Sequence, residues 1–181
     1  MQIGNTEAKW GVVSIGFHWL TAMAVVCLFA VGLWMERLDY THPLYKTVPH
    51  LHKSFGVLLI AVVLFRLIWR FKQGVPHPLE NHQRWEKLMA KTIHIAFYVL
   101  ILLMFPTGYL ITTAKGQGLE VFSLFSIPSV ISGIENLEDI AGEIHEMIAF
   151  TIISLAGFHM LGAIKHHFID KDNTLKRMLG L

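Results

Sequence analysis

Apolar residues in this chain gather in four long runs, which polar connections separate. Each run approaches the ~20 residues that a helix needs to cross about 30 Å of hydrocarbon. The runs cover residues 13–35, 51–69, 93–113 and 144–168. The pattern therefore predicts an all-α protein, a transmembrane four-helix bundle that forms one integral-membrane domain over residues 1–181.

Charged residues are distributed unevenly between the connections. The connection after the second run and the C-terminal tail hold many basic residues: Arg70, Lys72, Arg84, Lys87, Lys91, Lys171, Lys176 and Arg177. The long connection over about residues 114–142 is acidic, and its apolar stretch EVFSLFSIPSVI indicates that it lies on the outer membrane face. Because cytoplasmic connections of membrane proteins are enriched in Lys and Arg, we expect both termini in the cytoplasm.

The composition agrees with membrane lipid as the main surroundings. Hydrophobic residues make up 54% of the 181 residues and charged residues only 15%, whereas about a quarter of a soluble domain is charged. The net charge is +2 without a long basic tract, so we expect no nucleic-acid partner. The single Cys27 excludes an internal disulfide. Eleven histidines, in contrast, are many for this length and require a chemical reason.

Four histidines fall inside the apolar runs at two depths. His145 and His159 lie fourteen residues apart in the fourth run. That separation is about 21 Å along a helix and returns to within about 40° of the same face. In the predicted topology His52 shares the outer depth of His145, and His18 shares the inner depth of His159. Each pair draws on two different helices, so its imidazoles face the same bundle interior.

Two neutral imidazoles that face each other form a bis-histidine site, which haem iron accepts as axial ligands. The pairs His18/His159 and His52/His145 therefore predict two haem iron sites, and the absence of a CxxCH motif excludes covalent attachment of the haem. A porphyrin would also fill the bundle core with apolar surface. Small residues near the ligands would let its plane approach the backbone. These residues are Gly16, Gly56, Ala156, Gly157 and Gly162.

The intramembrane histidines are also compatible with roles that involve no haem. A single intramembrane histidine can simply hydrogen-bond a neighbouring helix, but four that match in depth indicate a function. A zinc site is a weaker alternative, because the stretch HEMIA at His145 lacks the second histidine of an HExxH motif. A small transporter with a histidine proton relay is a further alternative, which a visible spectrum without haem bands would identify.

Further polar residues lie toward the inner side. Arg66 interrupts the second run, where it either extends toward the cytoplasmic headgroups or binds a haem propionate of the inner site. His94, His166 and His167 have no obvious partner at matched depth. They are either interfacial polar residues or the lining of a quinone pocket, where an imidazole hydrogen-bonds a quinone oxygen. We expect the remaining histidines to be surface residues of the connections: His42, His50, His77 and His82.

Stretches along nearly the whole chain resemble the bacterial cytochrome b561 family. They are SIGFHWLTA around His18, PHLHKSFGVLL around His52, LFRLIWRFK, TIHIAFYVL around His94, EIHE around His145 and the C-terminal GFHMLGAIKHHFIDKDNTLKRM. The resemblance implies a four-helix membrane bundle with two non-covalent haem b groups, held by His18 with His159 and by His52 with His145. It also implies a multi-pass protein of the bacterial inner membrane.

The resemblance further implies one-electron chemistry with a quinone, and some family members are superoxide:ubiquinone oxidoreductases. Our main prediction is a cytochrome that exchanges single electrons between membrane ubiquinone and an outer-face donor or acceptor, such as superoxide or a redox partner protein. The alternative is a cytochrome b anchor subunit of a partner dehydrogenase or hydrogenase. The acidic outer connection does not favour the superoxide anion. Lys53 beside His52 either extends toward the headgroups or is a candidate guide for that anion.

Overall fold

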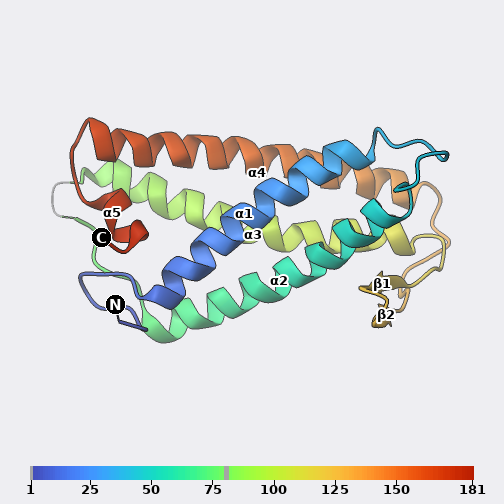
Figure 1. Cartoon of the computed structure of the whole chain (residues 1–181), viewed down its shortest axis with the longest axis horizontal. Coiled ribbons are helices and arrows are strands. Elements are labelled where there is room, and N and C mark those ends of the chain that lie inside the picture. The colour runs from blue at the N-terminus through green and yellow to red at the C-terminus, as the bar shows by residue number, and fades with distance from the viewer. Residues whose placement is uncertain (1, 80–81) are drawn as a thin grey trace.

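Four long helices form the body of the protein in the computed structural model, which describes residues 2–79 and 82–181 (Figure 1). They are α1 (Val12–Met35), α2 (Thr47–Gln73), α3 (Arg84–Thr113) and α4 (Leu137–Phe168), and a short α5 (Thr174–Leu179) follows. Each long helix contains one of the predicted apolar runs and is long and apolar enough to cross a membrane. The prediction of a transmembrane four-helix bundle is therefore confirmed.

Polar residues extend α3 and α4 beyond their apolar runs. At the start of α3, the backbone N–H of Gln83 donates to the side chain of Glu86 at 2.9 Å, as part of a capping box. The first turn of α4 contains Glu138 and Asp139, and its last turn contains basic residues. Both charge distributions are favourable for the helix dipole. The ends of these helices are thus stabilised by capping and charge rather than by apolar burial.

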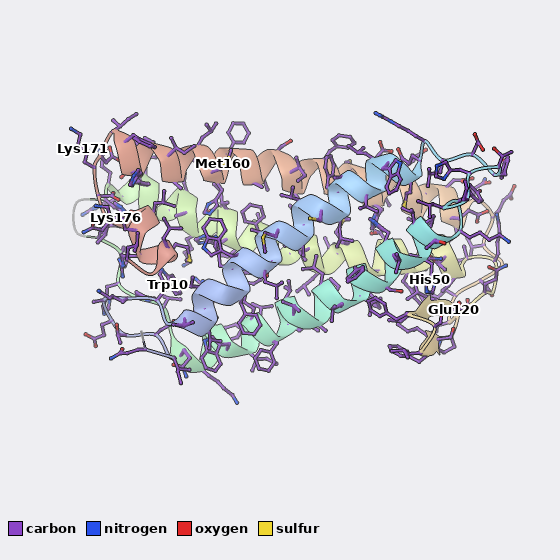
Figure 2. The ribbon with its side chains drawn as sticks, in the orientation of Figure 1. Trp10, His50, Glu120, Met160, Lys171 and Lys176 are labelled. Atoms are coloured by element: carbon purple, nitrogen blue, oxygen red, sulfur yellow. The ribbon has the colours of Figure 1, made fainter. Side chains whose placement is uncertain are left out.

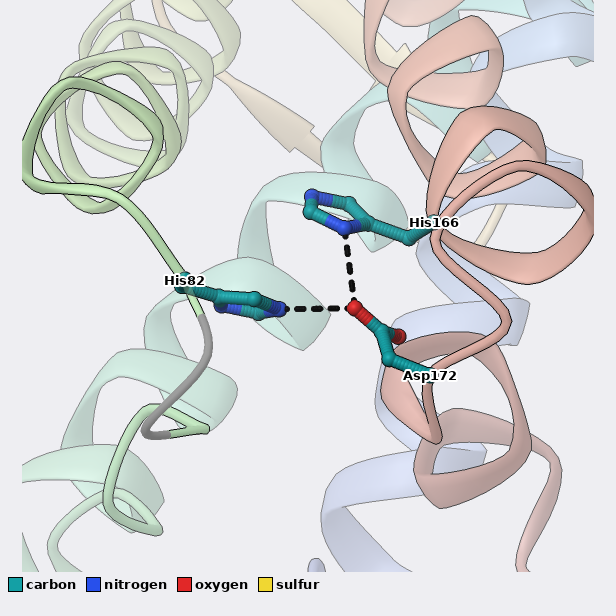
Figure 3. A group of neighbouring side chains, drawn as sticks. All are labelled: His82, His166 and Asp172. Carbon is teal, nitrogen blue, oxygen red and sulfur yellow. Dashed lines mark hydrogen bonds and ion pairs between the residues drawn. The ribbon is translucent and has the colours of Figure 1, made fainter.

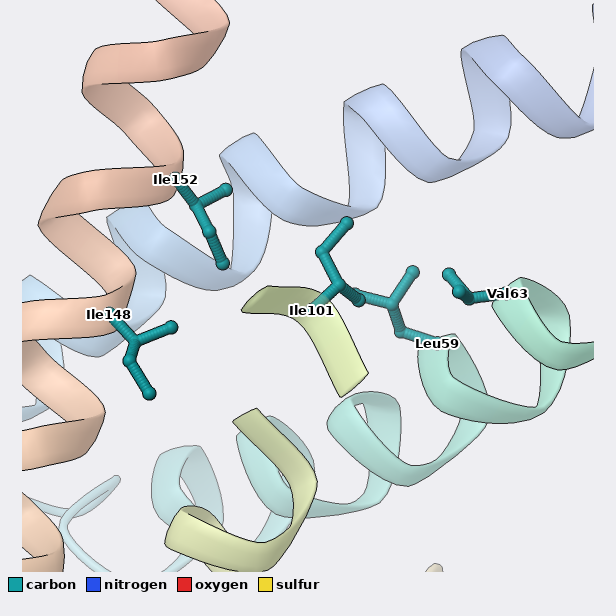
Figure 4. Packing of buried hydrophobic residues seen from close by; sticks show 5 residues of the cluster. All are labelled: Leu59, Val63, Ile101, Ile148 and Ile152. Atoms are coloured by element: carbon teal, nitrogen blue, oxygen red, sulfur yellow. The ribbon is translucent and has the colours of Figure 1, made fainter. Parts of the chain in front are cut away.

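The long helices associate as two pairs. α1 packs along α2, and α3 packs along α4, whereas α1 and α4 are in contact at only a few positions. A central apolar cluster joins α2, α3 and α4 (Figure 4). It consists of Leu59, Val63, Ile101, Ile148 and Ile152. Few other apolar side chains of the spans are buried, so most of the apolar surface is left for lipid.

Both termini lie at the same end of the bundle, which we call the terminal end (Figure 1). Lys171 and Lys176 also lie there, whereas His50 and Glu120 lie at the opposite, hairpin end (Figure 2). The chain therefore separates basic and acidic connections as the sequence predicts. The assignment of the terminal end to the cytoplasm stays a prediction.

A short antiparallel hairpin lies in the connection from α3 to α4, where no strand was expected. Strand β1 (Leu119–Val121) pairs with β2 (Phe125–Ile127). The turn between them places Phe122 and Ser123 at positive φ angles of 50° and 57°. Leu124 at the turn stays exposed. The hairpin thus buries Leu119 and Val121 of β1 and exposes Leu124, while its position at the membrane face stays a prediction.

The hairpin is fixed to α2 by one buried hydroxyl. The backbone N–H of Phe122 donates to Oγ of Ser54 at 2.9 Å, and that hydroxyl donates to the carbonyl of His50 at 2.9 Å. The ring of Phe122 also packs edge-on against Phe55. Ser54 is fully buried, and it thus connects the hairpin to the beginning of α2.

Replacing Ser54 by Ala tests this connection. The N–H of Phe122 then loses its acceptor, and a buried hydrogen bond lost in this way costs about 1–3 kcal/mol. We expect faster hydrogen–deuterium exchange in the hairpin, measured by mass spectrometry on the detergent-solubilised protein. Ser132→Ala, at an exposed position of the same connection, is the control. Equal exchange rates in the two variants would show that Ser54 does not hold the hairpin.

Candidate functional site

Histidines from the spans meet as two pairs inside the bundle. In the outer pair, His52 of α2 and His145 of α4 have ring centroids 6.5 Å apart and an interplanar angle of 66°. In the inner pair, His18 of α1 and His159 of α4 have ring centroids 6.3 Å apart and an angle of 65°. The structure thus brings together the residues of each predicted pair, while their role as haem ligands stays a prediction.

The spacing within each pair fits a metal centre between the two rings. An imidazole nitrogen lies about 2 Å from the metal that it binds, so two rings on opposite sides have centroids about 6 Å apart. Both pairs lie across the interface between α1/α2 and α3/α4, where direct helix contacts are few. The central apolar cluster comes between the two levels along the helices. The bundle therefore has two separate positions for a planar group.

Glycines leave open space beside both pairs. Gly56 lies one turn after His52 on α2, and Gly162 lies three residues after His159 on α4. A Cβ at either glycine would meet nothing within 4 Å, although both residues are half-buried. Protein interiors are normally close-packed. Open space at these positions fits the approach of a porphyrin to the backbone.

Thr107 of α3 orients the outer pair. Its hydroxyl lies 3.0 Å from the carbonyl of Leu103 and 3.0 Å from Nδ1 of His145. Because the hydroxyl donates its hydrogen to the carbonyl, its oxygen accepts the Nδ1–H of His145. Nε2 of His145 then keeps a free lone pair, which is the form that binds a metal. Thr107 was not predicted from the sequence, where nothing distinguishes it from other threonines of the apolar runs.

Two further glycines face the rings of the outer pair. A Cβ at Gly108 would lie 3.1 Å from Cε1 of His145, and a Cβ at Gly32 would lie 3.5 Å from Cε1 of His52. Nδ1 of His52 is buried and has no hydrogen-bond partner among the described residues. A side chain at Gly108 would therefore crowd the ring of His145, whereas one at Gly32 would only come into contact with the ring of His52.

The inner pair lies in a more polar cluster. Nη2 of Arg66 is 3.3 Å from Nδ1 of His18, and the guanidinium lies 5.7 Å from the centre of the Tyr98 ring. The ring of His94 lies beside His159, with centroids 5.4 Å apart. The expectation that His94 has no partner at its depth is wrong, because α3 packs along α4 and carries His94 to the level of His159.

Arg66 is a half-buried cation without an anionic partner in the described part of the chain. No carboxylate of the described residues lies within ion-pair distance of it. The hydroxyl of Tyr98 beside it is also buried without a hydrogen-bond partner there. An unpaired charge is costly in a low-dielectric interior. The pair of donors therefore fits an anionic group bound near the inner histidines.

His166 and His167 lie at the terminal end, away from the inner pair. Nδ1 of His166 and Nε2 of His82 each lie 3.0 Å from Oδ2 of Asp172 (Figure 3). The expectation that His82 is a surface residue is wrong, since only 14% of its side chain is exposed. Burial alone would raise the pKa of the Asp172 carboxyl, but hydrogen bonds from Thr174 and His82 and the charge of His166 lower that pKa below its ordinary value.

The three residues of the predicted quinone pocket are not joined in one cluster. His94 contacts the inner pair, and His166 bonds to Asp172. Nδ1 of His167 is buried and has no hydrogen-bond partner among the described residues. In residues 2–79 and 82–181 no hydrogen bond or ring contact joins His94 to His166 or His167.

Comparisons with known proteins agree on one family. A sequence model described as prokaryotic cytochrome b561 matches residues 9–181. The chain is 42% identical over 180 residues to cytochrome b561 homolog 2 of Escherichia coli (strain K12), an alignment that covers 99% of this chain and 96% of that protein. It is 24% identical to cytochrome b561 homolog 1 of the same organism, covering 94% and 97%. It is also 24% identical to a probable superoxide oxidase CybB of Yersinia pestis, covering 94% and 96%.

Replacing Thr107 by Val removes the hydroxyl and keeps the side-chain shape. We expect the affinity of the outer pair for haem to fall by about ten-fold, because nothing then fixes the ring of His145. The measurement is the rate of haem transfer to apomyoglobin, followed by absorbance, together with the reduction potential. Thr112→Val is the matched control, since the Thr112 hydroxyl bonds only to the carbonyl of Gly108 among the described residues. Identical haem loss and potential in both variants would contradict the role of Thr107.

Proposed function

Because the chain belongs to the prokaryotic cytochrome b561 family, we propose that it holds two haem b groups and carries single electrons between its outer face and ubiquinone. Membership makes it a bacterial membrane protein that binds haem b and transfers electrons. We assign one haem to the outer pair and one to the inner pair. We further place the protein in the inner membrane with the terminal end in the cytoplasm.

The two histidine pairs are the observation that carries this proposal. Each pair consists of two rings from different helices at the spacing of a bis-histidine centre, and each lies across the interface where the two helix pairs are in contact at few positions. A bound haem supplies a reversible one-electron carrier at each level. If two histidines hold each haem, substrates would react at the edge of each site.

The half-buried guanidinium of Arg66 supports a propionate site at the inner level. Its charge has no carboxylate partner among the described residues. The Tyr98 hydroxyl also has no hydrogen-bond acceptor there. A propionate would accept from both donors. Arg66 would thereby hold the inner haem in one rotational position.

The apolar layer between the levels separates electron transfer from proton transfer. The pairs lie about 21 Å apart along α4, and the central apolar cluster fills the space between them along the helices. It contains no group that binds a proton. Ubiquinone takes up two electrons and two protons, so those protons would enter at the terminal end. His94 and His167 are our candidates for hydrogen bonds to the quinone oxygens, because His166 is already bonded to Asp172.

Two lysines at the hairpin end support superoxide as the donor. A depression there is lined by Lys46, Thr47, His50, Lys53, Glu120 and Ser123, and Lys53 follows the outer-pair residue His52 in the chain. The positive charge there would attract an anion despite the acidic connection. Two superoxide anions would each give up one electron and leave as O2, while one ubiquinone becomes ubiquinol.

Alanine at each histidine of the pairs tests the haem assignment. We expect His52→Ala or His145→Ala to lose the outer haem, and His18→Ala or His159→Ala to lose the inner one. The pyridine haemochrome assay should therefore fall from two haems per chain to about one in each variant. His42→Ala, at an exposed position, should keep both. Full haem content in any one of the four variants would disprove that pairing.

Charge reversal at Lys53 tests the substrate. Superoxide generated continuously in the presence of the purified protein should reduce ubiquinone without a partner protein. We expect Lys53→Glu to lower this rate several-fold at low salt and less at high salt, because the attraction is screened. Lys176→Glu makes the same charge change at the terminal end and is the control. Quinone reduction that requires a partner dehydrogenase would instead favour an anchor subunit.

A further inference from the structure

A cluster of metal-binding side chains lies at the terminal end, outside both histidine pairs. His82 comes from the connection before α3, His166 from the last turn of α4, and Asp172 from the connection before α5. One atom of each, Nε2, Nδ1 and Oδ2, lies within 4.8 Å of the others. In Figure 3 both rings point a nitrogen toward the same carboxylate oxygen. We call these three residues the tail cluster.

We propose that the tail cluster binds a divalent transition-metal ion such as Zn2+, and that the bound ion fastens the C-terminal tail to the connection between α2 and α3. Two imidazoles and a carboxylate form a ligand set that such ions accept. Neither the haem ligands nor the candidate quinone residues His94 and His167 belong to it. The inference therefore stands independently of the proposed function.

The distances within the tail cluster match the edges of a coordination sphere. Asp172 Oδ2 lies 3.0 Å from Nε2 of His82 and 3.0 Å from Nδ1 of His166. Ligand atoms that each lie about 2 Å from one tetrahedral ion are about 3 Å apart. An ion could enter between them with small movements of the two rings, whose centroids are 4.5 Å apart.

The imidazole hydrogens are too few for the acceptors around them. Nδ1 of His166 lies 2.9 Å from Oδ2 of Asp170 as well as 3.0 Å from Oδ2 of Asp172. It carries at most one hydrogen, which both carboxylates must share. A metal ion bound by Nδ1 would serve both oxygens at once. Asp170 is thus a candidate fourth ligand, in competition with water.

The charge around the tail cluster favours a cation. Three carboxylates meet there, from Glu86, Asp170 and Asp172, and with neutral imidazoles Lys165 is the one cation of the described residues that pairs with any of them. Its ammonium bonds to Glu86 and lies 2.8 Å from Oδ2 of Asp170. The remaining negative charge is largely shielded from water, because only 4% of the Asp172 side chain is exposed. A dication would compensate it.

The surroundings also fix the carboxylate that would bind the ion. The backbone N–H of Thr174 donates to Oδ1 of Asp172 at 2.8 Å, which leaves Oδ2 directed at the two imidazoles. Such outer hydrogen bonds orient metal ligands and raise their affinity. The site therefore has ligands of the right kind, a negative charge and a support for its carboxylate.

Zinc titration of the full-length, haem-loaded protein tests the proposal. After removal of metals with a chelator, the wild type should bind one Zn2+ per chain, measured by competition with a fluorescent zinc indicator and by elemental analysis. We expect His82→Ala and Asp172→Asn each to weaken binding by more than about ten-fold. His42→Ala, at the hairpin end, should bind like the wild type. All variants should retain the haem spectrum, which shows that they are folded.

A structural readout distinguishes this site from other histidines. Zn2+ should slow hydrogen–deuterium exchange of residues 169–181 in the wild type and not in His82→Ala. A wild type that binds no zinc at millimolar concentration would overturn the proposal and leave a hydrogen-bonded cluster only. Equal zinc affinity or equal tail protection in His82→Ala and the wild type would also overturn it.

Discussion

A histidine inside hydrocarbon needs a partner for its ring nitrogens, and this requirement organises the bundle. No water is available there, so each buried nitrogen must meet a protein group or a ligand. The rings of His18 and His159, and those of His52 and His145, meet across the interface where the helix pairs touch least. The apolar cluster between the two levels is small. The planar groups that we propose would complete the core of the bundle.

The two levels differ in what surrounds the rings. The outer pair has a neutral hydroxyl, that of Thr107, behind His145. The inner pair has the guanidinium of Arg66 at 3.3 Å from His18. A nearby cation favours an added electron. With haem at both levels, as we propose, this difference would favour electron flow from the outer to the inner site, toward the proposed quinone position at the terminal end.

Hydropathy and helical periodicity are sufficient to predict the spans and both histidine pairs, because the spacing from His145 to His159 depends on one helix alone. They do not predict the partners of His82, since Asp172 is 90 residues away and its position depends on how the tail folds back. Thr107 could not be predicted either, because many Ser and Thr hydroxyls in helices bond to a carbonyl of their own helix. The hairpin could not be predicted, because its turn contains no glycine. Phe122 and Ser123 adopt the positive φ angles instead.

The two adjacent histidines at the end of α4, His166 and His167, lie between the tail cluster and the bundle. Neighbouring residues of a helix point about 100° apart, so His166 and His167 must face different partners. His166 bonds to Asp172, whereas Nδ1 of His167 is buried without a hydrogen-bond partner in the described chain. A metal ion that fixed His166 in the proposed tail cluster would also fix the rotation of the last turn of α4. It would thereby fix the direction of His167. In the function that we propose, the tail cluster would therefore orient His167 relative to a quinone without touching the proposed haem ligands.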